Sequence, residues 1–177
     1  LGDVYKRQLL HHVNVPDTST VKAATEALQT RFLKNTKVVP ALFEIIATSP
    51  DLAVRQLAAV ELRKKLSKSS ASWSKQPVEI RTGIKTKLLE IVALESAAAM
   101  RNSLACVINE IACKELPHNM WPELLPWMFE SAESPNAVQR QTAMLVLFYV
   151  LETFVDSEEL KSHLPRIMAL FAKGIQD

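Results

Sequence analysis

The segment SPDLAVRQLA at residues 49–58 returns in altered form as SPNAVQRQTA at residues 134–143. Both segments contain Ser-Pro, four intervening residues, Arg-Gln, one residue and Ala. This order fits the start of a helix, because serine is a preferred N-cap and proline suits the first helical position, where its missing N–H would have no helical partner. We therefore predict that helices begin at Ser49-Pro50 and at Ser134-Pro135.

A third copy, SAAAMRNSLA at residues 96–105, lies between these two segments. It lacks the proline, and its distance from the capping serine to the arginine is one residue shorter. The three arginines, Arg55, Arg101 and Arg140, follow each other at steps of 46 and 39 residues. Repeats of about 40–47 residues are typical of HEAT and armadillo proteins. The recurrence favours a structural role for these arginines, a hydrogen bond or ion pair between repeats, over contact with a partner.

A second motif consists of an apolar residue, proline, any residue and two apolar residues. It occurs as VPALF at 39–43, LPWMF at 125–129 and LPRIM at 164–168. Pro126 and Pro165 are 39 residues apart, which is the step between Arg101 and Arg140. Since two unrelated features share one step, we predict a true structural repeat in which each motif opens a helical segment.

Helical periodicity between these markers predicts an all-α fold, an α-solenoid of about four antiparallel HEAT-like helix pairs. The expected pairs are 18–34 with 37–48, 50–68 with 77–94, 97–115 with 121–133, and 135–154 with 158–173, after a short helix at 9–15 and with the longest loop at 67–76. We expect one continuous solenoid, with two repeats in 9–94 and two in 95–177. Residues 1–8 are treated as a leader outside the fold, and the unclosed helical pattern at the end suggests a fragment of a longer chain.

The composition argues against several other classes of protein. Three glycines cannot build a phosphate-binding loop, and no His, Cys or carboxylate group has the spacing of a metal or catalytic site, so we expect no cofactor and no enzyme activity. Cys106 and Cys113 are too far apart along a helix to form a disulfide. No apolar run is long enough for a membrane span. The basic residues between 63 and 87 are interpreted as a solvated helix face rather than a phosphate-binding stripe, so no nucleic acid is expected.

The region from Ala23 to Val92 resembles the N-terminal domain of the importin-β family. The resemblance rests on ATEAL at 24–28, PALFEII at 40–46, VRQLAAVELRKKL at 54–66, Trp73 and RTGIKTKLL at 81–89. It continues through RNSLACVI at 101–108, WPELLP at 121–126, RQTA at 140–143 and LETF at 151–154. The whole set covers residues 9–177 and is most similar to the importin-four subgroup, whose cargoes include ribosomal proteins and histones.

This resemblance implies a nuclear transport receptor, a superhelix whose N-terminal repeats bind Ran in its GTP form through the second helix of each pair. Cargo would bind elsewhere and nucleoporins mostly to later repeats, as the receptor moves between cytoplasm and nucleus through the nuclear pore. The Ran-binding candidates are Glu44 in the first pair, Arg81, Lys85 and Glu90 in the second, and Glu123, Trp127 and Glu130 in the third. Trp73 and Trp121 are expected to be packing anchors. The alternative is a HEAT scaffold unrelated to nuclear transport.

Overall fold

The computed structural model describes residues 37–154 and 158–174, and within them the regular structure is helical and contains no strand. The predicted all-α helical-repeat class is confirmed. The helices expected at 9–15 and 18–34 and the leader at 1–8 lie outside the described residues. The chain divides into two compact units, residues 1–87 and 88–177, and each is described by itself.

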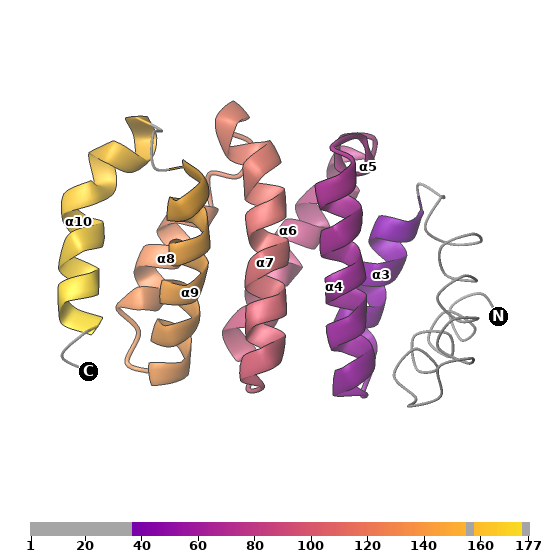
Figure 1. Cartoon of the computed structure of the whole chain (residues 1–177), viewed down its shortest axis with the longest axis horizontal. Coiled ribbons are helices and arrows are strands. Elements are labelled where there is room, and N and C mark those ends of the chain that lie inside the picture. Colours follow the sequence, from indigo (N-terminus) through magenta and orange to yellow (C-terminus); the bar gives the residue numbers. More distant parts are fainter. Residues whose placement is uncertain (1–36, 155–157, 175–177) are drawn as a thin grey trace. The chain divides into compact units, whose positions relative to one another are not determined.

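In the first unit, α3 (Val38–Thr48) packs against α4 (Leu52–Lys68), as Figure 1 shows. The short helix α5 (Ala71–Ser74) follows, and α6 (Val78–Leu94) begins in this unit and continues into the next. The apolar residues Val39, Leu42 and Ile46 of α3 and Ala58, Leu62 and Leu66 of α4 are buried at helical spacing. The contact therefore follows from one apolar stripe on each helix.

The second unit contains α7 (Ala98–Glu115), the 3-10 turn η2 (Leu116–His118), α8 (Leu124–Ala132), α9 (Ala137–Phe154) and α10 (Glu158–Gly174). Helix α9 contacts both α7 and α8, and α10 contacts α9 (Figure 1). Leu104 and Ile108 of α7, Met128 of α8, and Val146 and Val150 of α9 are fully buried. Helices α7 and α9 begin 39 residues apart and end 39 residues apart, so the step found in the sequence is the step between two equivalent helices.

The prediction that Ser49 caps α4 is wrong. The helix begins at Leu52, and its N-cap is Asp51, whose Oδ1 accepts hydrogen bonds from the N–H groups of Ala53 (2.8 Å) and Val54 (3.3 Å). Ser49 is the C-cap of α3, where its own N–H donates to the carbonyl of Ile45. Ser49 lies two residues before the N-cap of α4 and does not reach its first N–H groups. Its Oγ instead accepts the N–H of Asp51 at 3.3 Å and so shapes the turn.

The same correction applies to Ser134. The carboxamide of Asn136 caps α9, because its Oδ1 accepts the N–H groups of Val138 (2.9 Å) and Gln139 (3.4 Å). Ser134 again supports the cap from two residues earlier, with its Oγ accepting the N–H of Asn136 at 3.1 Å. The two copies therefore share one hydrogen-bonding scheme, in which serine shapes the turn and Asp or Asn caps the helix.

In the third copy, Ser96 is not the cap either. The N-cap of α7 is Ala97, whose φ of −77° and ψ of 115° suit the position but whose side chain cannot accept a hydrogen bond. Glu95 makes the hydrogen bond that Ser49 and Ser134 make in the other two copies: its Oε1 accepts the N–H of the N-cap residue Ala97 at 2.9 Å. With Ala97 as cap, Arg101 follows after four residues, as in the other two copies, and the apparent shortening disappears.

Three further predictions need correction. The expected loop at 67–76 contains α5, which carries the buried Trp73. The turn η2 was not foreseen. Pro40 and Pro126 lie in the first turns of α3 and α8, but Pro165 lies inside α10, which begins at Glu158. Pro165 has no N–H to donate to the carbonyl four residues earlier, and Figure 1 shows the first turns of α10 inclined to the rest of the helix.

The uncapped start of α7 gives a reciprocal test. We expect Asn136→Ala to lower the free energy of unfolding by about 1 kcal/mol, and Ala97→Asn to raise it by a similar amount, because an N-cap side chain is lost or gained. Urea denaturation of the 177-residue chain measures both changes. The control is Ala98→Asn, one residue inside the helix, which should bring no gain. An equal effect at 97 and 98 would contradict the assignment of the cap.

Candidate functional site

In the first unit, the candidate residues lie on α3 and α6. Glu44 is exposed on α3. Arg81 and Lys85 are one turn apart on α6, so they share a face of that helix, but Arg81 is half-buried and Lys85 is buried. Of these three residues, Glu44 therefore presents the most of its side chain to a partner, and Lys85 the least.

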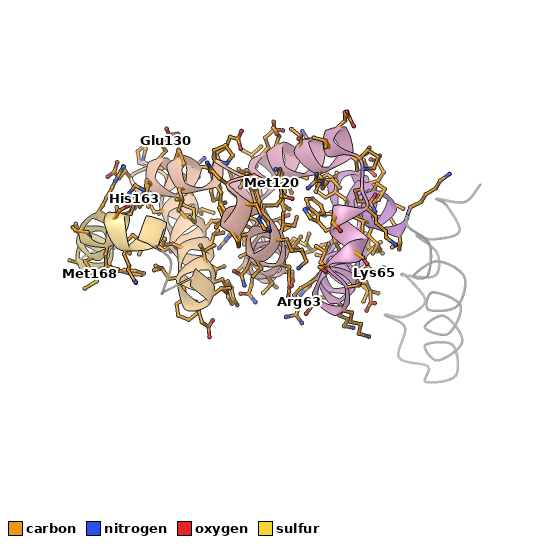
Figure 2. The ribbon with its side chains drawn as sticks, turned by 90° about the horizontal axis from the view of Figure 1, so that it is seen from above. Arg63, Lys65, Met120, Glu130, His163 and Met168 are labelled. Atoms are coloured by element: carbon orange, nitrogen blue, oxygen red, sulfur yellow. The ribbon has the colours of Figure 1, made fainter. Side chains whose placement is uncertain are left out.

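In the second unit, Glu90 is exposed near the end of α6, and the remaining candidates gather on α8. Glu123, Trp127 and Glu130 follow each other at steps of four and three residues, which places them on one face of the helix. Both carboxylates are exposed, and Trp127 is half-buried between them. Figure 2 shows Glu130 at the outer edge of its helix. We refer to these three residues as the acidic stripe of α8.

The acidic stripe is exposed because the opposite face of α8 is buried in the core. Leu124, Leu125, Met128 and Phe129 are buried, which turns the intervening positions outward. Glu123 occupies the N-cap position, where negative charge interacts favourably with the helix dipole. The stripe can therefore offer two exposed carboxylates and a half-buried indole to a basic partner without loss of core packing.

Arg101 and Arg140 make matching hydrogen bonds. Nη1 of Arg101 donates to the carbonyls of Glu95 (3.2 Å) and Ser96 (2.7 Å). Nη1 of Arg140 donates to the carbonyls of Ser134 (3.1 Å) and Pro135 (3.0 Å). In both cases the guanidinium reaches back six and five residues and holds the loop that leads into its own helix.

Arg55 occupies the corresponding position in α4 and is half-buried. The loops held by Arg101 and Arg140 are those that join successive helix pairs. A direct role of the three arginines between repeats stays a prediction. The hydrogen bonds described above give arginine a structural role at this position in the third and fourth pairs.

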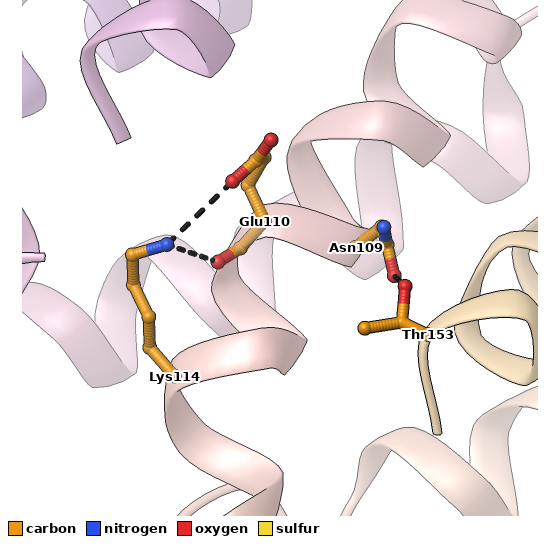
Figure 3. A network of polar contacts seen from close by, with 4 residues as sticks. All are labelled: Asn109, Glu110, Lys114 and Thr153. Atoms are coloured by element: carbon orange, nitrogen blue, oxygen red, sulfur yellow. Dashed lines mark hydrogen bonds and ion pairs between the residues drawn. The ribbon is translucent and has the colours of Figure 1, made fainter. Parts of the chain in front are cut away.

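Polar contacts between α7 and α9 were missed at the sequence level. The hydroxyl of Tyr149 donates to Oδ1 of Asn102 at 3.0 Å, and that of Thr153 donates to Oδ1 of Asn109 at 3.3 Å. Figure 3 shows the Thr153–Asn109 contact. The two asparagines are two turns apart and the two hydroxyl residues are one turn apart, so each pair lies on one helix face. This spacing can be read from the sequence, but it indicates hydrogen-bonded pairs only once α7 is known to pack against α9.

Figure 3 also shows Lys114, whose Nζ lies 2.9 Å from the carbonyl oxygen of Glu110 and 3.6 Å from its carboxylate. The charge of Glu110 acts on a neighbouring thiol as well. Burial, and after it the Glu110 carboxylate, raises the pKa of Cys113 above the usual thiol value. Cys113 and Cys106 are free thiols, both half-buried on α7. This environment favours the protonated, unreactive form of Cys113.

Two other properties bear on the kind of site. In the part of the chain that the structure describes, no group of three or more His, Cys, Asp and Glu side chains could hold a metal ion. Among the described helices, none is both long and apolar enough to cross a membrane.

Comparison with known families agrees with this architecture. The model of the importin-beta N-terminal domain matches residues 24–94, and a model described as IPO5-like, TPR repeats matches residues 96–177. The repeated helix pairs define a helical-repeat protein of the HEAT class, a class built for binding along helix faces. The chain belongs to the importin-β family. This assignment favours the importin-β family over an unrelated HEAT scaffold.

Individual relatives support the assignment. The probable importin subunit beta-4 of Schizosaccharomyces pombe is 34% identical over 82% of this chain and 13% of its own length. Importin-4 of Mus musculus is 29% identical over 96% of this chain and 15% of its own. The solved structure of Kap121p bound to the SUMO protease Ulp1p is 25% identical, with a TM-score of 0.78 over 99% of this chain and 16% of its own. The chain thus spans about one seventh of the length of the curated relatives it matches.

The arginine contacts can be tested by removing the guanidinium while keeping most of the aliphatic side chain. We expect Arg140→Met to lower the free energy of unfolding by about 1 to 2 kcal/mol, because two backbone carbonyls lose a charged donor. Lys64→Met is the control, since Lys64 forms only an exposed ion pair with Glu61, which contributes little. Equal losses in the two variants, measured by urea denaturation, would show that the carbonyl contacts of Arg140 have no special importance.

The raised pKa of Cys113 has consequences for reactivity and stability. The folded chain holds the thiol proton more tightly than the unfolded chain. Its contribution to stability is therefore full below the ordinary thiol pKa and is lost as the pH rises through the folded-state value. We expect the pH profile of iodoacetamide alkylation at Cys113, followed by mass spectrometry, to have a higher midpoint in the folded chain than in urea. Glu110→Gln should lower that midpoint, and a midpoint equal to that in urea would contradict the prediction.

Proposed function

We propose that this chain is the Ran-binding part of a nuclear import receptor. The observation that carries the proposal is the match of residues 24–94 to the importin-beta N-terminal domain, followed directly by the second importin-type match at 96–177. The resemblance noted in the sequence assigns Ran binding to this part of the family. The GTP form of Ran is the expected ligand, bound through the second helices of the pairs.

The surface chemistry of the described residues supports this role. The second helices of three pairs, α3, α6 and α8, carry the exposed carboxylates of Glu44, Glu79, Glu90, Glu123 and Glu130. A basic partner surface fits such helices, because complementary charges steer the encounter and fix the orientation of the complex. Arg81 and Trp127 are half-buried and can contribute at the edges of the contact, whereas Lys85 has little surface to offer.

The wider activity belongs to a receptor of the relatives' length. Kap121p has been solved in complexes with Ulp1p, with Nup53p and with Pho4p, so that relative binds other proteins directly. For this protein, the proposed cargoes are proteins such as ribosomal proteins or histones, and the proposed nucleoporin sites lie on repeats outside this chain. Its place of action is the cytoplasm, the nucleus and the nuclear pore between them. It acts by binding and release, without catalysis, cofactor or membrane insertion.

Binding to the two nucleotide forms of Ran tests the proposal. We expect the 177-residue chain to bind Ran locked in the GTP form at least about tenfold more tightly than Ran in the GDP form, a difference of about 1.4 kcal/mol. Biolayer interferometry with each form on the sensor measures the two dissociation constants. Equal affinity for both forms, or no binding by a chain shown to be folded by circular dichroism, would contradict the proposal.

A charge reversal then tests the acidic stripe. Glu130→Lys should weaken binding of the GTP form by about five- to tenfold, mostly through a slower association rate, because an exposed charge acts chiefly on the encounter. Glu152→Lys is the matched control, since Glu152 is also exposed but lies on α9, a first helix. If both reversals weaken binding equally, long-range charge and not the stripe determines the affinity.

A further inference from the structure

The last turns of α4, the short helix α5 and the turn after it carry positive charge without any negative charge. Residues 62–78 contain five Lys and Arg residues and no Asp or Glu. The other 160 of the 177 residues contain 16 Lys and Arg against 19 Asp and Glu, so they are acidic on balance. The excess positive charge of the chain is therefore concentrated in this one segment of the first unit. We call its five basic residues the basic collar of α4: Arg63, Lys64, Lys65, Lys68 and Lys75.

Helix geometry spreads this charge around the end of α4. Consecutive residues of an α-helix point about 100° apart, so Arg63, Lys64 and Lys65 face three different directions. Figure 2 shows Arg63 and Lys65 on different sides of the helix. Leu66 takes the remaining direction and is fully buried. Arg63, Lys64 and Lys68 are exposed and Lys65 is half-buried, so the end of α4 presents positive charge on each side that is not packed against the core.

Only a small part of this charge is neutralised within the protein. Nζ of Lys64 lies 2.7 Å from Oε1 of Glu61, in an exposed ion pair. In the part of the chain that the structure describes, the side chains of Arg63, Lys68 and Lys75 form no ion pair. The C-terminus of a helix attracts basic residues, but its partial charge amounts to only about half an elementary charge. The helix dipole therefore accounts for one basic residue at this place and not for five.

The surroundings of the basic collar indicate which kind of anion fits it. Trp73 is 1% exposed and Leu66 is fully buried, so the last turns of α4 and helix α5 offer no aromatic ring for base stacking and no large apolar side chain for insertion into a lipid surface. Four of the five basic residues are lysines, which lack the bidentate contacts that arginine makes with phosphate. Ser67, Ser70 and Ser74 are exposed between them and add hydroxyl donors. Carboxylates on a flexible chain fit this set of groups better than nucleic acid or membrane.

We propose that the basic collar of α4 binds an acidic, extended segment of another protein, rich in Asp and Glu. The end of a helix is about 10–12 Å wide, so the collar would face about three to four residues of an extended chain. The contact is electrostatic, so it speeds the encounter of the two proteins and weakens as salt is added. The inference does not depend on Ran binding, because α4 is a first helix and the Ran-binding candidates lie on second helices.

The test measures binding of a fluorescein-labelled oligoglutamate peptide of about eight residues, twice the span of the collar. Fluorescence anisotropy with the 177-residue chain at about 50 mM salt gives its dissociation constant. The double variant Lys64→Gln, Lys68→Gln should raise this constant at least about fivefold, because two exposed charges of the collar are lost. A rise in salt to about 200 mM should weaken peptide binding to the unchanged chain severalfold.

The matched control is the double variant Lys87→Gln, Lys161→Gln. It also removes two exposed lysines, so the net charge changes equally, but Lys87 lies on α6 and Lys161 on α10, outside the collar. The control should raise the dissociation constant less than about twofold. Circular dichroism verifies that both variants keep the helical content of the unchanged chain.

Three results would overturn the proposal. The first is the absence of peptide binding by the folded chain at about 50 mM salt, where electrostatic contacts are strongest. The second is an equal loss of affinity in the two double variants, which would show that total charge and not the collar attracts the peptide. The third is tighter binding, in the same buffer, of oligouridylate of equal charge or of phosphatidylserine vesicles. In that case the collar recognises phosphate on a nucleic acid or a lipid, and not the carboxylates of a protein.

Discussion

The apolar faces of these helices can be buried only against other helices, and this constraint shapes the rest of the structure. Neither α7 nor α8 has a core of its own, and both bury their apolar residues against α9. The chain must therefore return each new helix to the same position relative to the last. Short connections with fixed geometry perform that task, which explains why the strongest signals in the sequence lie at helix starts rather than in the apolar residues between them.

The helices themselves were largely predictable. The bounds expected for the second half of the chain agree with α7, α9 and α10 to within about two residues, because the apolar period and the Ser-Pro and Arg-Gln markers act over short distances. The caps were misplaced because Ser49 can serve either the end of α3 or the start of α4, and that choice depends on where α3 ends. The prediction that Pro165 opens a helix was wrong for a similar reason. The same proline motif lies in the first turns of α3 and α8 but in the interior of α10.

The sequence predicted which candidate residues share a helix face, but not which of their side chains are exposed. Sequence spacing placed Glu123, Trp127 and Glu130 on one helix face, and the structure has them there. Spacing could not reveal that Lys85 is buried while Glu44 is exposed, because burial depends on which helix covers which face. The contacts of Asn102 and Asn109 were hidden for the same reason, since their partners are 47 and 44 residues away in the chain.

The hydrogen bonds of Arg101 and Arg140 to the preceding loop also limit how the length of that loop can change. Each guanidinium spans a set number of residues, so a single insertion in either loop would move the carbonyls out of reach. The second helices have more freedom, since α6 has 17 residues and α8 has 9. The difference of eight residues is about 2.2 helical turns, so the two helices differ in length by more than a whole number of turns. The second helices of these pairs therefore differ in length, while each arginine reaches back the same six and five residues to the carbonyls of its loop.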